Sequence, residues 1–480
     1  MIRTIIAATA LLVVAVPAAS PVAAQTQQEA LTARYDRALA AGYKSLMLCS
    51  AIAIAERNGT TRTPESVEQF ELTGIQSPHD AIIGELPYEI VRRPSGHVAY
   101  VAVKWADDMS PRIAVYYGKD TGCSSLPIGA PEEAGNPQVP LAEEAPAQGR
   151  VLGTATLAVA KGDKPQPLNP LGKVFQAALD GSYGKNARTT AVLVHFGRPR
   201  GNLVEQSAYA PGFDAATPQR TWSVAKSLAA TLVGAAVHAG EVKVEDPVGI
   251  SGWLMGGASD PRNAITIDNA LRMATGRYSD TPGNRTDALY FGGSTVDETA
   301  MNWPVIHQPG IVFRYANNDT LLAVKAIGQW LSFYPPHEFL AKLGMNNTVA
   351  ETDIRGEYVL SSQVWSTAGD LAKLGQLYLD DGVLPSGERI LPEGWVKYVT
   401  TPGGPQPPMG TFGYGAGFWL LNKEEGVPPD TFAALGNRGQ FIVIVPSRDL
   451  VIVRRGEDPP GSGFDVAAFT RDVLAALPAE

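Results

Sequence analysis

The spacing of apolar residues in the first part of the chain changes from helical to alternating, which predicts one long helix followed by a pair of strands. Residues 29–59 carry apolar side chains at helical spacing and predict a largely helical stretch. The regions 99–106 and 112–118 alternate with period two around a polar turn, which predicts two strands. We assign residues 25–128 to a small α/β N-terminal unit on this pattern.

A second, larger unit begins near residue 172. It follows a connector, residues 129–171, that is rich in Pro, Ala, Glu and Gly and has no core of its own. Strands are predicted at both ends of the unit and helices between them. The predicted strands are 189–197, 203–210, 412–421, 440–446 and 449–455, and the helices are 225–238, 265–276, 321–332, 366–382 and 464–477. This order predicts an α+β fold whose single antiparallel sheet is assembled from both termini of the unit.

The N-terminus has the pattern of a Sec-type signal peptide. A short basic start precedes an apolar run, and small residues at Val22 and Ala24 predict cleavage after Ala24. The alternative is a membrane anchor, but the run is short for a span and no basic stop follows it. Since no later stretch is long and apolar enough to span a bilayer, we predict a periplasmic or secreted protein without a membrane span after signal removal.

The two cysteines, Cys49 and Cys123, are predicted to form a disulfide, because an isolated pair in an oxidising compartment is more often bonded than reactive. Two cysteines and six scattered histidines do not form a zinc-binding pattern. The net charge is −9, with acidic and basic residues mixed along the chain, so a nucleic-acid partner is not indicated.

Ser223 and Lys226 form a Ser-x-x-Lys pair at the start of the apolar helix 225–238. Three residues is nearly one helical turn, so the hydroxyl and the amine share a face. A serine needs an adjacent base to act as a nucleophile, and the amine can serve only if its pKa falls from about 10.4. A second copy, Ser182 and Lys185, lies between loop-forming residues, whereas a lysine in a buried helix is costly unless it has a function or a partner.

Tyr315 and Asn317 are the next candidate pair, because no other tyrosine of the chain is followed two residues later by asparagine. A tyrosine beside a lysine can have a lowered pKa and relay a proton, and the asparagine amide can hold Lys226 or a substrate carbonyl. The alternative is a tyrosine packed at a turn, with the asparagine capping the next helix.

The glycine-rich segment 435–440 leads into the predicted strand 440–446. Glycines at the start of a strand allow a backbone to approach a ligand closely, and an N–H there could complete an oxyanion hole with the N–H of Ser223. The alternative is an ordinary hairpin turn.

Taken in order, these three motifs resemble the serine β-lactamase and penicillin-binding-protein superfamily over about residues 172–480. The chain looks most like the class C branch and its esterase, D-aminopeptidase and 6-aminohexanoate-oligomer hydrolase relatives. The resemblance implies a β-lactamase/transpeptidase-like fold, in which helices and a helical subdomain flank the sheet. It also implies a serine hydrolase that works without a metal or organic cofactor.

By position in these motifs, the resemblance also assigns roles to single residues. Ser223 resembles the acylated nucleophile, Lys226 its activator and Tyr315 the general base. Asn317 resembles the residue that orients Lys226 and the substrate. The second oxyanion N–H would come from the backbone of Gln440, just after Gly439.

The chain departs from the family at the Lys-Thr-Gly strand motif, where Asn437-Arg438-Gly439 stands instead. Arg438 could replace the missing lysine as a cation, with a different geometry. The departure favours an esterase or amidase acting on a small-molecule substrate over a β-lactamase or penicillin-recognising peptidase. Two further alternatives are a non-hydrolytic sensor on the same fold and an interaction module in residues 25–128.

Overall fold

The computed structural model describes residues 21–135, 155–156, 169–197, 204–280 and 286–477. Most of the predicted signal peptide and of the connector 129–171 lies outside these residues. The first described element is the helix α1 (Pro21–Arg57), which includes the predicted cleavage position after Ala24.

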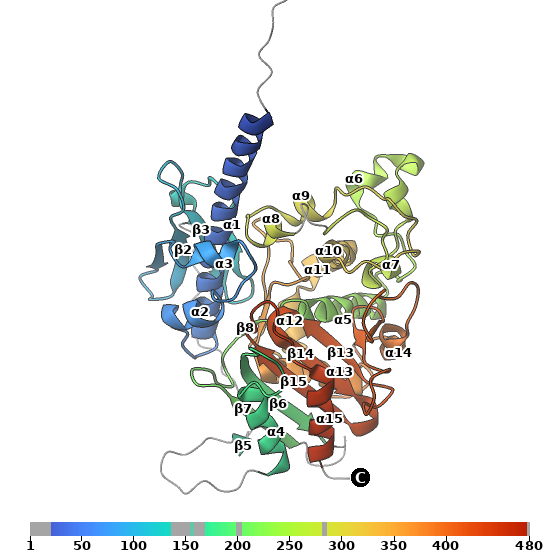
Figure 1. The fold of residues 1–480 in the computed structure, drawn as a ribbon. Helices are drawn as coiled ribbons and strands as arrows, with labels where there is room; N and C mark the ends of the chain where they lie inside the picture. Colours follow the sequence, from blue (N-terminus) through green and yellow to red (C-terminus); the bar gives the residue numbers. More distant parts are fainter. Residues whose placement is uncertain (1–20, 136–154, 157–168, 198–203, 281–285, 478–480) are drawn as a thin grey trace, which may run out of the picture.

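The N-terminal unit is a four-stranded sheet covered by α1 (Figure 1, blue). Its strands follow one another in space as in the sequence, and each pair is antiparallel. Cys49 of α1 and Cys123 of the last strand form the predicted disulfide. The further elements of this unit are α2 (Pro64–Phe70), α3 (His79–Ile83), β1 (Tyr88–Arg92), β2 (Val98–Val103), β3 (Arg112–Gly118) and β4 (Gly122–Ser125).

Residues Thr26–Arg57 of α1 are long and apolar enough to cross a membrane by length and composition, which the sequence analysis did not anticipate. The most apolar window of this segment is 100% buried inside the protein. Its side chains pack against β2, β3 and β4, so this helix forms the core of the N-terminal unit.

The larger unit is built on an eight-stranded sheet in the order β11-β12-β13-β14-β15-β6-β7-β5. The strand β15, near the C-terminus, pairs antiparallel with β6, with Val453 opposite Leu193. This pairing confirms the prediction of one sheet assembled from both ends of the unit. The strands are β5 (Ala155–Thr156), β6 (Thr189–Phe196), β7 (Val204–Tyr209), β11 (Gly413–Tyr414), β12 (Trp419–Leu420), β13 (Phe432–Gly436), β14 (Gln440–Val445) and β15 (Leu450–Gly456).

Helices cover both faces of this sheet, because its central strands are apolar on both sides. Val192 and Val194 of β6 pack with α4 (Pro170–Leu179) and α15 (Val466–Ala476). Leu193, which points to the opposite face, belongs to the core that includes α5 (Val224–His238) and α13 (Ala368–Leu379).

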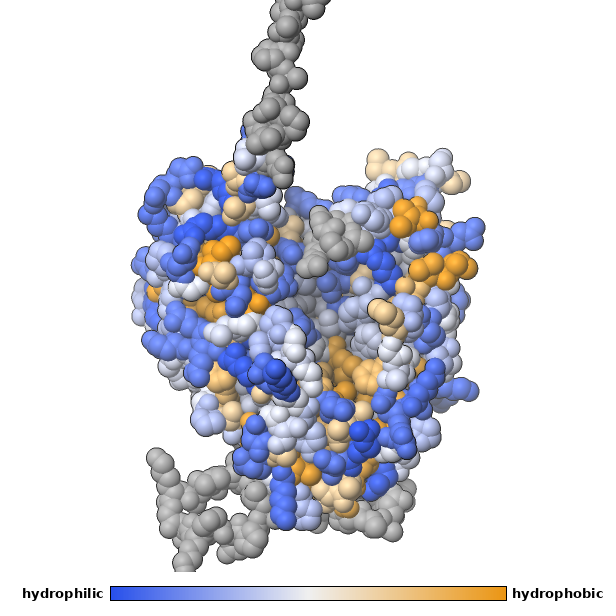
Figure 2. Space-filling model, in the orientation of Figure 1, coloured by the Kyte–Doolittle hydropathy of each residue, from blue (hydrophilic) through white to orange (hydrophobic). Residues whose placement is uncertain are grey.

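The middle of the chain forms a helical region beside α5 (Figure 1, yellow and light green). In the same orientation, the molecular surface is hollowed between the N-terminal unit and this region (Figure 2). A small sheet in the order β8-β10-β9 adjoins α5. The remaining elements are β8 (Gln219–Arg220), β9 (Val349–Ala350), β10 (Val364–Ser366), α6 (Ser251–Leu254), α7 (Ile267–Leu271), α8 (Asp287–Tyr290), α9 (Val296–Ala300), α10 (Asn317–Ala326), α11 (Gly328–Phe333), α12 (Pro336–Lys342) and α14 (Trp395–Thr400).

Candidate active site

Ser223 stands at the N-cap of α5, at the end of a short connection from β8. The backbone N–H of Thr221 donates to the carbonyl of Val364 in β10 at 2.8 Å, which fixes this connection. Trp222 adopts a positive φ of 50°, which is strained for a bulky residue. The chain therefore turns sharply just before Ser223, and this turn determines where its hydroxyl lies.

Lys226 lies in the first turn of α5 and is 1% exposed. Its Nζ lies 3.0 Å from Ser223 Oγ, 2.7 Å from Asn317 Oδ1 and 2.8 Å from the Ser361 carbonyl oxygen. Burial lowers the pKa of Lys226 to about 7, a shift that the Asp280 carboxylate opposes and the Arg220 guanidinium reinforces. A neutral amine can donate to two of these oxygens and accept a hydrogen bond from Ser223 Oγ–H with its lone pair.

Tyr315 lies close to the same serine, and the Ser223 side chain acts to lower the pKa of its hydroxyl. The centroid of the Tyr315 ring lies 5.4 Å from that of Trp419 and 6.0 Å from that of Tyr414. Lys226 Nζ lies 5.1 Å from the centroid of the Tyr315 ring. Burial raises the pKa of Tyr315 to about 12, so the expected lowering of this pKa is wrong. The reason is that the rings of Tyr414 and Trp419 exclude water from the phenolate. The neighbouring Lys226 has a lowered pKa, so it supplies little positive charge to stabilise the phenolate.

Asn317 begins α10 and links the lysine to the helical region. Its Oδ1 accepts from Lys226, and its Nδ2 donates to Thr286 Oγ1 at 2.8 Å. The N-cap of α10 is Ala316, and no side-chain capping bond is present there. The side chain of Asn317 therefore orients Lys226 and does not cap the helix, which was the alternative.

Two groups near Lys226 were missed by the sequence analysis. The backbone carbonyl of Ser361 accepts from Lys226, and the Ser361 hydroxyl lies 2.6 Å from Tyr290 OH. Asp280 accepts from the backbone N–H of Asn318 at 2.9 Å, and burial raises its pKa to about 6. No local motif marks either residue, because Asp280 reaches the site through the packing of the helical region and Ser361 through the turn before β10.

Gly436, the last residue of β13, brings the backbone of the sheet close to Ser223. A Cβ on Gly436 would lie 2.4 Å from the Thr221 carbonyl oxygen and 3.2 Å from the Ser223 nitrogen. Only glycine therefore allows this approach without displacing the backbone that precedes the serine.

Gly439 and Gln440 lie on the far side of the same turn. A Cβ on Gly439 would overlap Arg454 and Asp458, and the side chain of Gln440 accepts from Arg455 Nε at 2.6 Å. The sheet backbone that lies against the Ser223 nitrogen is that of Gly436, and Gln440 is its partner across the turn.

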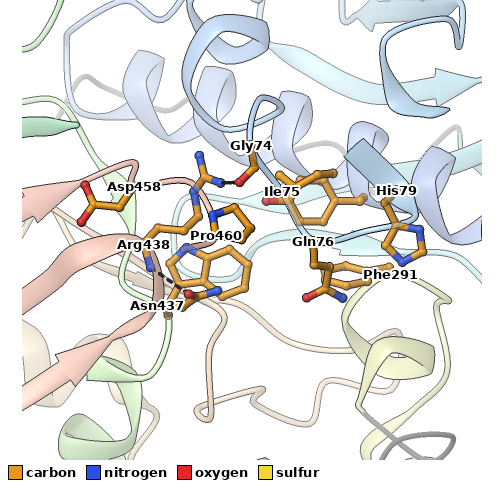
Figure 3. Close-up of a pocket in the computed structure, with 11 residues that line it drawn as sticks. Gly74, Ile75, Gln76, His79, Phe291, Asn437, Arg438, Asp458 and Pro460 are labelled. Carbon is orange, nitrogen blue, oxygen red and sulfur yellow. Dashed lines mark hydrogen bonds between the residues drawn. The ribbon is translucent and has the colours of Figure 1, made fainter. Parts of the chain in front are cut away.

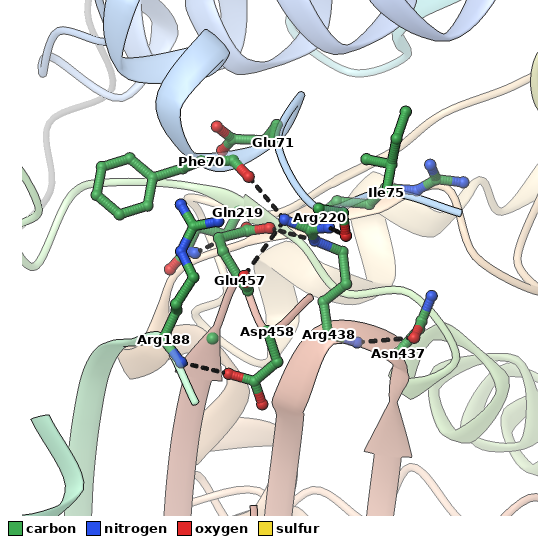
Figure 4. A network of polar contacts seen from close by, with 12 residues as sticks. Phe70, Glu71, Ile75, Arg188, Gln219, Arg220, Asn437, Arg438, Glu457 and Asp458 are labelled. Atoms are coloured by element: carbon green, nitrogen blue, oxygen red, sulfur yellow. Dashed lines mark hydrogen bonds and ion pairs between the residues drawn. The ribbon is translucent and has the colours of Figure 1, made fainter. Parts of the chain in front are cut away.

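Arg438 does not serve as the free cation that the sequence analysis expected. Its Nε donates to Glu457 Oε2 at 2.7 Å, and its Nη1 donates to the Gly74 carbonyl at 2.7 Å. Its Nη2 donates to the carbonyls of Phe70 and Thr73, at 2.7 and 3.0 Å. Figure 4 shows this side chain reaching from the β13–β14 turn to the N-terminal unit. Most of its donors hold the two units together, and its charge is paired with Glu457, so Arg438 is not a free cation for a substrate carboxylate.

The second Ser-x-x-Lys copy has none of the surroundings of the first. Ser182 is exposed in the turn after α4, and its Oγ donates to Asp180 Oδ1 at 2.5 Å. Lys185 is also exposed. Within the described ranges, no group of three or more His, Cys, Asp or Glu side chains is placed to hold a metal ion.

Two comparisons of the sequence with known proteins give matches over the larger unit. A family model described as Beta-lactamase matches residues 187–476. A 6-aminohexanoate-dimer hydrolase from Paenarthrobacter ureafaciens is 27% identical over 304 residues, which are 54% of this chain and 71% of that protein.

Solved structures show a similar fold at low sequence identity. A Bacillus anthracis protein described as a 6-aminohexanoate-dimer hydrolase has a TM-score of 0.50 and 20% identity, covering 62% of this chain and 79% of its own. A D-stereospecific amidohydrolase from Streptomyces sp. has a TM-score of 0.47 and 17% identity, covering 64% of this chain and 97% of its own.

Proposed function

Because this chain belongs to the beta-lactamase family and has the β-lactamase/transpeptidase-like fold, we propose that it is an exported serine hydrolase acting through an acyl-enzyme on Ser223. The observation that carries the proposal is the buried Lys226, whose Nζ lies 3.0 Å from Ser223 Oγ and whose pKa is lowered to about 7. At neutral pH a large fraction of this lysine is a free amine, which is the form that can accept the serine proton.

The proposed acylation starts when Lys226 Nζ accepts the proton of Ser223 Oγ as the oxygen attacks the carbonyl carbon. Backbone N–H groups of Ser223 and of the chain next to Gly436 stabilise the resulting oxyanion. Tyr315 is a neutral phenol, so it gives its proton to the leaving group and takes up the proton held by Lys226. The leaving group departs, and water then hydrolyses the ester on Ser223 by the reverse proton path.

The substrate class is an ester or amide of a small molecule. The related protein from Paenarthrobacter ureafaciens is named for the hydrolysis of a dimer of 6-aminohexanoate, so we extend amide hydrolysis to this chain as part of the proposal. Ala434 and Leu435, which precede Gly436, offer no group to bind a carboxylate, and Arg438 is occupied. This favours an esterase or amidase over a β-lactamase.

Export and the division into units are part of the same proposal. The basic and apolar start of the chain supports a signal peptide ending at Ala24, and the Cys49–Cys123 disulfide suits an oxidising compartment. In the mature protein, residues 25–128 would form an accessory unit, 129–171 a connector and 172–480 the hydrolase unit.

Labelling separates this proposal from its alternatives. We expect a fluorophosphonate to add to Ser223 with loss of fluoride, and mass spectrometry of the digested protein to place the adduct there. Penicillin should leave no stable adduct. Stable adducts with both reagents would favour a penicillin-recognising peptidase, and turnover of penicillin would show a β-lactamase. The absence of any fluorophosphonate adduct would favour a non-hydrolytic sensor.

The pH dependence of kcat/KM should report the pKa of Lys226. The neutral amine is the active form, so activity should rise with pH through a midpoint near 7 and fall about tenfold per unit below it. The measurement uses an uncharged nitrophenyl ester, read at a wavelength insensitive to nitrophenol ionisation. Asp280→Asn removes a negative charge that raises the pKa of Lys226 and should move the midpoint to lower pH. A flat profile across this range would exclude Lys226 as the proton acceptor.

A further inference from the structure

A pocket lies at the contact between the N-terminal unit and the hydrolase unit (Figure 3). The hydrolase unit contributes Trp222, the neighbour of Ser223, and Asn437, the neighbour of Gly436. The N-terminal unit contributes Ile75 and Gln76 from the segment between α2 and α3. The two residues adjoining the proposed oxyanion site thus face a wall made by a different part of the chain.

This wall is held in a fixed position by the β13–β14 turn. Arg438 donates to the carbonyls of Phe70, Thr73 and Gly74, and Glu457 holds its guanidinium from the other side. All these bonds are buried or partly buried, so breaking them would leave unpaired polar groups out of water. The segment 70–79 is therefore part of the rigid surroundings of Ser223.

Gly74 gives segment 70–79 a second close contact with the hydrolase unit, in addition to the bonds of Arg438. Its φ is +65°, and a Cβ there would lie 2.6 Å from Pro459 Cβ. On the other side, the backbone N–H of Ile75 donates to Asp80 Oδ1 at 3.1 Å. These contacts leave little freedom for the wall to withdraw from the pocket.

The charged groups around the pocket are already paired. Arg438 is bound as described, and Asp458 accepts from Arg454 at 2.7 and 2.8 Å and from the backbone N–H of Arg188 at 2.7 Å. Burial lowers the pKa of His79, which keeps its imidazole neutral near pH 7. A ligand in this pocket therefore meets no free charge.

The pocket is separate from the side chains that move protons in the proposed mechanism. Neither Lys226, Tyr315 nor Asn317 lines it. In the proposed mechanism Tyr315 protonates the leaving group, so the leaving group must lie beside that tyrosine. The group on the other side of the carbonyl, the acyl group, is then the one that points toward Trp222 and Asn437.

We propose that segment 70–79 of the N-terminal unit forms the end wall of the acyl-group pocket and restricts the enzyme to short, uncharged acyl groups. This inference rests on the proposed hydrolase function. It makes the N-terminal unit part of the substrate site, and Gln76 a specificity-determining residue that does not take part in the chemistry.

The test compares nitrophenyl acetate, butyrate and octanoate as substrates of Gln76→Ala. Shortening Gln76 opens the wall, so the ratio of kcat/KM for octanoate to that for acetate should rise about tenfold. Gln76→Trp narrows the pocket and should lower the butyrate-to-acetate ratio by a similar factor. Gln69→Ala is the matched control, because Gln69 is an exposed residue of α2 outside the pocket.

The outcomes separate this inference from the proposed function. Unchanged ratios in both Gln76 variants, with acetate hydrolysis still dependent on Ser223, would overturn the role of the wall and leave the hydrolase intact. The role of the wall would also be overturned if the Gln76 variants changed the preference among acetates with different leaving groups but left the preference among acyl groups unchanged. Loss of the Ser223 dependence itself would remove both proposals. Thermal unfolding of each variant checks that the wall is still folded.

Discussion

Ser223→Ala is expected to reduce the turnover of nitrophenyl acetate by about 10⁴- to 10⁶-fold, to near the uncatalysed rate. The substitution removes the oxygen that forms the acyl-enzyme in the proposed mechanism, while the neighbouring backbone that fixes α5 is unchanged. Alanine is accommodated at this N-cap because Ser223 makes no side-chain capping bond. The measurement is kcat/KM for the purified variant, with circular dichroism as a check on the fold.

Ser182→Ala is the matched control for this experiment, since it removes a serine from the other Ser-x-x-Lys copy. Ser182 is exposed and bonded to Asp180, so its loss should leave the rate within about twofold. If Ser223→Ala keeps the activity, or if Ser182→Ala loses it, the nucleophile has been assigned to the wrong serine.

Lys226→Met should lower kcat/KM by about 10²- to 10⁴-fold, the usual contribution of a positioned base. Methionine has a similar length and is apolar, so it fits among the buried residues of α5. The Asn317 amide oxygen and the Ser361 carbonyl would lose their donor. These oxygens lose a hydrogen bond, but the variant no longer has to desolvate an ammonium group, and we expect it to fold.

The control is Lys185→Met, at the exposed lysine of the other copy, which should retain the activity of the parent protein. The pH profile provides an independent readout, because the residual activity of Lys226→Met should no longer have a midpoint near 7. A variant that keeps both the rate and the midpoint would show that another group takes the serine proton.

The long periodic elements could be predicted from the sequence, and the short ones could not. The apolar run 225–238 matches α5, and the predicted helix 366–382 matches α13, whose N-cap is Thr367. The predicted helix 265–276 is reduced to α7, because Arg272 ends it and Met273 takes a positive φ. Tertiary contacts outweigh local propensity at this point, since Met273 Sδ accepts from the backbone N–H of Ala316.

The same distinction holds for the strands near the site. The prediction of one continuous strand over 412–421 is wrong, since β11 and β12 are separate two-residue strands around a turn at Gly417. A Cβ on Gly417 would lie 2.6 Å from Ala230 Cβ of α5. The sheet bends here to pass the helix, and β13, which approaches Ser223, was not predicted as a strand at all.

The sequence by itself determined the pairing of Ser223 with Lys226, because three residues on a helix place two side chains on one face. It also singled out Tyr315 and Asn317 by their order after this pair. Only the tertiary structure decided the pKa values of Lys226 and Tyr315, since the burial of both side chains results from packing between distant segments. It likewise decided that Arg438 binds the N-terminal unit, because the carbonyls it meets lie more than 300 residues away. Local spacing follows from backbone geometry, whereas burial and long-range hydrogen bonds depend on which surfaces the whole chain brings together.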